Sequence, residues 1–251
     1  MIALAWPLLI SIGLLLLALI LLIGLTLLHS KIPTALRQID AFDRLTRSVG
    51  LAVENGTRLH ISLGRGSLFT TRGASALAGL AMLRKLTERT SLSDRPPVVT
   101  TGDASLAILS QDTLQSGYRA AGAEDQYRYS TGRLTGLTPF AYAAGTIPVT
   151  KDEQVSTNVF LGDFGSESAL MVDAAERDNS TLIAASDNIS AQSVFYATSQ
   201  DPLIGEELFA AGAYVGAGPV HEASLTVQDI LRWLIILAIV IGSGLKFLGV
   251  F

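Results

Sequence analysis

A glycine-containing turn is the first place where this chain could do chemistry. Gly64-Arg65-Gly66-Ser67 ends an apolar run and precedes a segment rich in small residues. Backbone N–H groups in such a turn can cradle a phosphate when a helix begins there. The dinucleotide pattern needs a third glycine where Phe69 stands, and Gly73 comes too late to replace it. We therefore interpret the turn as a tight corner that caps the next helix, with nucleotide binding as the alternative.

Three other predicted strand-to-helix turns are built in the same style and read TTGDAS, LGDFGSES and ASDNIS. In a parallel sheet such turns meet at the carboxyl edge, where open α/β sheets bind ligands. Carboxylates gathered there, Glu167 among them, would suit a Mg²⁺ or Ca²⁺ ion. Helix capping demands the same residue types and is the preferred interpretation. The candidate ligand-binding residues are Gly64, Gly66, Ser67, Asp103, Ser105, Asp163, Ser166 and Asp187.

The sequence offers few groups for catalysis. It has no Gly-x-Ser-x-Gly elbow and no Walker lysine motif. Cysteine is absent, and the three histidines, His29, His60 and His221, are far apart in the chain. His60 lies inside a predicted strand, where Leu59 and Ile61 point to the opposite face, so we expect a buried, hydrogen-bonded imidazole. We predict no catalytic residues, no metal site and no cofactor.

Apolar runs alternate with helical patterns through the middle of the chain. Strands are predicted at 57–63, 97–101, 157–162 and 181–186, and helices at 74–89, 105–121, 140–144, 167–177, 190–198 and 204–215. Residues 126–134 are either an edge strand or a loop. Such alternation indicates parallel pairing with helices on both faces. The predicted fold class is therefore α/β: a Rossmann-like three-layer domain with a mostly parallel sheet, spanning 57–225.

Both ends of the chain are apolar enough to cross a membrane. Residues 4–28 carry no charge, and a helix of that length reaches about 37 Å, against a hydrocarbon core of about 30 Å. This span, 1–29, has no basic residue before it and is too long for a cleaved signal peptide. The second span, 226–251, holds Arg232 and Lys246, which can snorkel to the headgroups. Ala238 and Gly242, four residues apart, are predicted to form a helix-packing face.

Positive charges predict the orientation of the spans. Lys31, Arg37, Arg44 and Arg47 follow the first span and none precedes it, and positive flanks stay inside. We therefore expect a protein of the cell membrane with two spans, both termini outside and the central domain cytoplasmic. Residues 30–56 are predicted to form an amphipathic juxtamembrane helix that starts near Pro33. It is either a collar at the membrane surface or a helix packed on its own domain.

Charge is distributed unevenly along the rest of the chain. Residues 30–95 hold 11 basic and 5 acidic side chains, whereas residues 96–225 hold 5 basic and 16 acidic ones. The basic part suits anionic headgroups, and the acidic part argues against nucleic-acid binding. Complementary surfaces of this kind also suit association between copies. The expected partners are the lipid bilayer, copies of the same chain and other subunits of a membrane complex.

Three stretches, RLHISLGRGSL, IGEELFAAGAYVG and EASLTVQDILRW, resemble a family of prokaryotic membrane proteins defined only as a domain of unknown function. The resemblance implies an α/β domain tied to a membrane and supplies no catalytic residues. Together with the two spans, it leads us to expect a non-enzymatic, membrane-anchored protein that forms a homo-oligomer or serves in a membrane complex. The alternative is a membrane-tethered ligand sensor, nucleotide binder or hydrolase that uses the carboxyl-edge turns.

Overall fold

The computed structural model describes residues 2–28, 36–70 and 73–248. The chain divides into two units, Met1–Arg37 with Gly218–Phe251, and Gln38–Ala217. His29, Lys31 and Pro33, which the sequence analysis used, lie outside the described residues. Each unit is described by itself.

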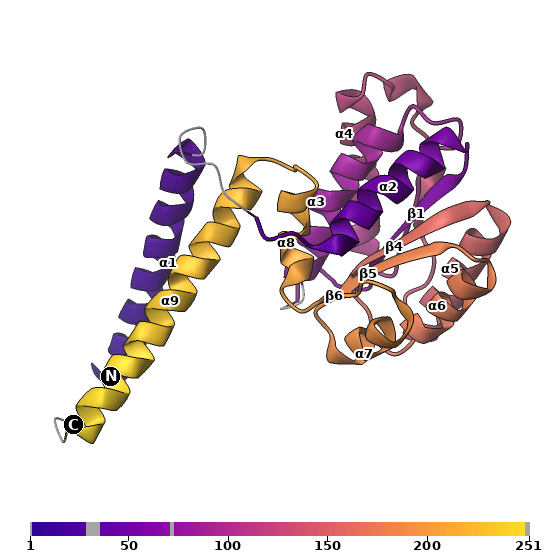
Figure 1. The fold of residues 1–251 in the computed structure, drawn as a ribbon. Coiled ribbons are helices and arrows are strands. Elements are labelled where there is room, and N and C mark those ends of the chain that lie inside the picture. The colour runs from indigo at the N-terminus through magenta and orange to yellow at the C-terminus, as the bar shows by residue number, and fades with distance from the viewer. Residues whose placement is uncertain (1, 29–35, 71–72, 249–251) are drawn as a thin grey trace. The chain divides into compact units, whose positions relative to one another are not determined.

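The Gln38–Ala217 unit is built on a six-stranded sheet with the order β3-β2-β1-β4-β5-β6, and every neighbouring pair is parallel (Figure 1). The strands are β1 (Arg58–Gly64), β2 (Val98–Thr101), β3 (Gly132–Leu134), β4 (Val155–Asp163), β5 (Thr181–Ser186) and β6 (Leu203–Ile204). This order is that of a doubly wound dinucleotide-binding sheet, with the switch point between β1 and β4. The predicted Rossmann-like α/β fold class is confirmed.

Helices cover both faces of this sheet, as expected for a three-layer domain. They are α2 (Asp40–Glu54), α3 (Gly73–Thr90), α4 (Ala104–Ala120), α5 (Pro139–Asp152), α6 (Ser168–Arg177), α7 (Ile189–Thr198) and α8 (Glu207–Tyr214). One core cluster joins α2, α3, α4 and α8 to Leu59, Ile61 and Leu63 of β1. A second joins α5, α6 and α7 to Phe160 of β4. Side chains alternate across a strand, so each face of the sheet has its own apolar layer.

Three predicted elements have different limits in the structure. Residues 126–134 form short 3-10 turns followed by the edge strand β3. The helix predicted at 140–144 continues to Asp152 with Pro148 inside it. The helix predicted at 204–215 is divided into β6 and α8, because Gly205 adopts a left-handed backbone with φ +62° and ends the strand.

The amphipathic helix that follows the first apolar segment packs on the α/β unit. The helix begins at Asp40, and residues 36–39 before it are not helical. Its apolar face, including Phe42, Leu45 and Val49, is buried in the core that also holds α3 and α8. Phe42 stacks on Tyr214 near the end of α8, with ring centroids 4.5 Å apart. The chain therefore enters and leaves this unit at neighbouring points.

The other unit contains α1 (Ile2–Leu28) and α9 (Pro219–Phe247), which lie side by side (Figure 1). Both helices are long and apolar enough to cross a membrane, in the segments Leu8–Leu28 and Pro219–Phe247. Their apolar side chains are exposed; Leu15 and Ile239, for example, are 68% and 62% exposed. A Cβ added at Gly13, Gly24, Gly242 or Gly244 would meet nothing within 4 Å.

Candidate functional site

The carboxyl edge between β1 and β4 is where a sheet of this order binds its ligand. Gly64 ends β1 and lies opposite Asp163, the last residue of β4. Gly64 has φ +72°, and a Cβ on it would stand 2.2 Å from the carbonyl oxygen of Asp163. Glycine is required here by both the backbone conformation and the close approach of the two strands.

The backbone donors of this turn are used inside the protein. The Gly64 N–H donates to the phenolic oxygen of Tyr142, 3.1 Å away, and the Arg65 N–H donates to the Asp163 carbonyl at 2.8 Å. The Gly102 N–H donates in turn to the Gly64 carbonyl, also at 2.8 Å. A phosphate cradle needs such N–H groups to face a ligand. At Gly64 and Arg65 they hold strands and a helix together instead.

A buried carboxylate lies at the same edge. Glu167 is only 3% exposed. Its Oε1 atom accepts hydrogen bonds from Arg65 Nε and from the Gly165 N–H, each at 3.0 Å. The stem of Arg65 lies against Gly102, where an added Cβ would stand 2.3 Å from Arg65 Cγ. A guanidinium and a backbone N–H are the usual partners of a bound phosphate, and here an internal side chain takes them.

The other predicted site residues are placed as follows. Asp103 caps α4 by accepting from the Leu106 N–H at 3.0 Å and from the Ser105 hydroxyl. Ser67 accepts from the Phe69 N–H at 3.4 Å. Gly66 and Asp163 are buried, Asp187 is partly buried and Ser166 is exposed. Among the described residues, no three histidine, aspartate or glutamate side chains converge to hold a metal ion. The ligand-binding roles of these residues stay predictions.

Polar side chains are buried beneath this edge, on the sheet face that packs on α5. The His60 imidazole lies between Asn158 Oδ1, 2.7 Å from Nδ1, and Thr100 Oγ1, 2.9 Å from Nε2. Because an amide oxygen only accepts, Nδ1 carries the proton and Nε2 accepts from the threonine hydroxyl. Burial lowers the pKa of His60 to about 4, although the hydrogen bond to Asn158 opposes the shift. The predicted buried strand histidine is confirmed.

Tyr142 joins α5 to the end of β1. Its phenol contacts the Ser62 hydroxyl in addition to the Gly64 N–H. Burial raises the pKa of Tyr142 to about 12, and hydrogen bonding with Ser62, Thr100 and the Gly64 N–H acts in the opposite direction. The phenol therefore stays neutral at physiological pH and acts as a structural connector between helix and sheet.

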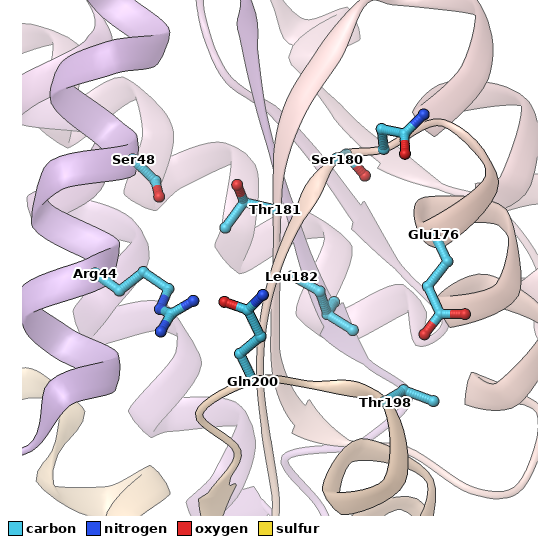
Figure 2. A pocket seen from close by; sticks show the side chains of 9 residues that line it. Arg44, Ser48, Glu176, Ser180, Thr181, Leu182, Thr198 and Gln200 are labelled. Atoms are coloured by element: carbon cyan, nitrogen blue, oxygen red, sulfur yellow. The ribbon is translucent and has the colours of Figure 1, made fainter.

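A pocket of about 430 Å³ opens at the opposite, amino edge of the sheet (Figure 2). It is lined by Arg44, Ser48, Glu176, Asn179, Ser180, Thr181, Leu182, Thr198 and Gln200. These residues come from α2, the end of α6 and the loop that follows it, the start of β5, and the end of α7 with the segment after it. Sequence reasoning missed this pocket, because no single turn or motif contains its lining and no residue in it has a distinctive spacing.

The fold and the two edges define an α/β protein with a Rossmann-like parallel sheet and two helices apolar enough to span a membrane. Residues 5–251 match the family described as a domain of unknown function, DUF6754, and the chain belongs to that family. No curated protein and no solved structure matches the chain significantly.

Proposed function

We propose that this chain is a membrane-anchored, non-enzymatic α/β protein that assembles with copies of itself or with other subunits of a membrane complex. The observation that carries the non-enzymatic part is the internal use of the carboxyl edge. The N–H groups of Gly64 and Arg65 are paired with Tyr142 and Asp163, and Glu167 holds the guanidinium that a phosphate would need. A sheet edge satisfied in this way has little left to offer a nucleotide.

A binding measurement tests this part of the proposal. The full chain is titrated with nucleoside mono-, di- and triphosphates and with Mg²⁺, and its thermal unfolding is followed. We expect no stabilisation, because a ligand raises stability only by binding the folded state better than the unfolded one. Stabilisation that Asp103→Ala or Asp163→Ala abolishes would instead support a ligand sensor or hydrolase at the carboxyl edge.

Membrane anchoring is supported by the exposed apolar surfaces of α1 and α9. Burying a leucine or isoleucine side chain gains roughly 1.5–3 kcal/mol, so two helices with this composition favour a hydrocarbon environment. The basic residues after α1 favour an orientation with both termini outside and the α/β unit in the cytoplasm. Protease added to intact, right-side-out cells is expected to leave residues 38–217 whole. Cleavage within that range would refute this orientation.

Self-assembly is supported by small residues on the exposed helices. Gly242 and Gly244 of α9 have open space where a Cβ would stand, and Ala238 lies one helical turn before Gly242. Small residues let two backbones approach closely in a lipid environment. The proposal expects the protein in mild detergent to run larger than one chain, and a single-chain mass at every protein concentration would contradict it.

A further inference from the structure

The amino-edge pocket brings polar side chains from four segments around one hollow (Figure 2). Arg44 and Ser48 are four residues apart in α2 and therefore share one helix face. Thr181 begins β5, and Gln200 follows α7. In Figure 2 the side chains of Arg44, Ser48, Thr181 and Gln200 lie on one side of the pocket and those of Glu176 and Thr198 on the other.

The polar groups that line the pocket differ in how far they are paired within the described chain. Ser48 is only 8% exposed and lines the pocket. Arg44 Nε is buried and donates to no described atom. Ser180 and Thr198, by contrast, are already bonded to backbone carbonyls at 2.9 Å. Buried polar groups in proteins are normally paired, so the Arg44 Nε atom calls for a ligand or ordered water.

The charge balance of the pocket narrows the chemistry of that ligand. The Nη2 atom of Arg44 lies 2.5 Å from Oδ2 of Asp201, so the positive charge of Arg44 is already compensated. The other charged lining residue is Glu176, an exposed carboxylate. No excess positive charge is left to attract a phosphate or carboxylate. The pocket offers hydroxyl and amide groups, which both donate and accept hydrogen bonds, and a guanidinium group, which only donates.

We infer that this pocket binds a neutral polyhydroxyl compound of sugar size. The cavity of about 430 Å³ lies within the usual range for small-molecule sites, about 300–1,000 Å³. Hydroxyl groups of such a ligand would pair with Ser48, Thr181 and Gln200. The ligand would contact α2 and β5 together, and would therefore hold α2 on the sheet.

The experiment uses the full chain in phosphatidylcholine nanodiscs, because glucoside and maltoside detergents carry neutral sugars themselves. Glucose, galactose, sucrose and maltose are titrated at millimolar concentrations, with inorganic phosphate as the anionic comparison and glycine as the zwitterionic one. Calorimetry gives affinity, and hydrogen exchange gives the site. We expect a neutral sugar to bind and to protect backbone amides of α2 and of residues 179–182 from exchange.

Two variants with a matched control locate the site. Ser48→Ala and Gln200→Ala are expected to weaken binding about tenfold, the effect of losing one hydrogen bond. Ala is the better helix former, so Ser48→Ala should leave the folded state as stable as before. Gln115→Ala, on α4 and away from the pocket, should bind like the wild type. Binding of phosphate or glycine alone, equal affinity in all variants, or no binding of any sugar would each overturn the inference.

Discussion

The buried imidazole of His60 makes the stability of the α/β unit depend on pH. The folded protein keeps this side chain neutral until its pKa of about 4, whereas a histidine in the unfolded chain takes up a proton near 6.5. Between these values the unfolded state binds more protons than the folded one. The free energy of unfolding therefore falls as the pH is lowered through this window. Above the window His60 is neutral in both states, and the full stability of the unit is present.

The size of the effect follows from the same two values. One pKa unit corresponds to about 1.36 kcal/mol, and a change from pH 7 to pH 4.5 covers about two units of the gap. His60 should thus contribute a loss of about 2.5 kcal/mol in the free energy of unfolding over this range. For a domain of ordinary stability, about 5–15 kcal/mol, this is a substantial fraction.

Urea unfolding of the full chain at pH 7 and pH 4.5, followed by near-ultraviolet circular dichroism, measures this loss. All six tyrosines lie in residues 38–217, while Trp6 and Trp233 lie in α1 and α9. The tyrosine signal therefore reports the α/β unit. His60→Gln keeps a hydrogen-bonding group near Thr100 but cannot be protonated, so its loss of stability should be smaller than the wild-type loss by about 2.5 kcal/mol.

The control is His221→Gln, which changes a histidine of α9 and should keep the wild-type pH dependence. The reasoning fails if His60→Gln and the wild type lose the same free energy of unfolding between pH 7 and pH 4.5. It also fails if nuclear magnetic resonance shows the His60 ring of the folded protein taking up a proton near pH 6.5.

Three further predictions concern single substitutions. Gly64→Ala should destabilise the protein by at least about 2 kcal/mol in urea unfolding, because it adds a clash with β4 to a left-handed backbone; Gly56→Ala, which is left-handed but has open space, should cost only about 1 kcal/mol. Glu167→Gln should cost about 3 kcal/mol in the same assay, because it leaves a partly buried guanidinium without its charge partner, and an unchanged unfolding midpoint would contradict this account. Gly242→Leu should reduce the oligomer yield in detergent sizing, whereas Ile241→Leu should leave it unchanged; equal profiles would remove Gly242 from the interface.

The fold class could be predicted because its signals are local. Apolar runs such as TNVFLG and TLIAAS lie between helical patterns, and each pattern identifies a strand or helix from its own residues. The limits of the elements depended on contacts that the pattern does not contain. Residues 204–215 were predicted as one helix, whereas the left-handed backbone of Gly205 separates β6 from α8.

The internal pairing at the carboxyl edge could not be predicted in the same way. Gly64 and Tyr142 are 78 residues apart, and Arg65 and Glu167 are 102 apart. Both pairs form only when the sheet brings β1 beside β4 and α5 onto its face. The sequence of a glycine turn is the same whether its N–H groups face a ligand or a tyrosine side chain. The amino-edge pocket has the same origin, since Arg44 and Gln200 meet only in the folded domain.

The stack of Phe42 on Tyr214 also has a mechanical consequence. Tension in the chain before α2 and after α8 would enter and leave the α/β unit at two rings 4.5 Å apart. This aromatic pair and the ends of α2 and α8 would bear the force first. The two helix ends would detach from the core one residue after another. The hydrogen bonds between the six parallel strands would not be in the direct line of force. Force on the chain would therefore act on the α/β unit at the Phe42–Tyr214 contact and would not stretch the sheet directly.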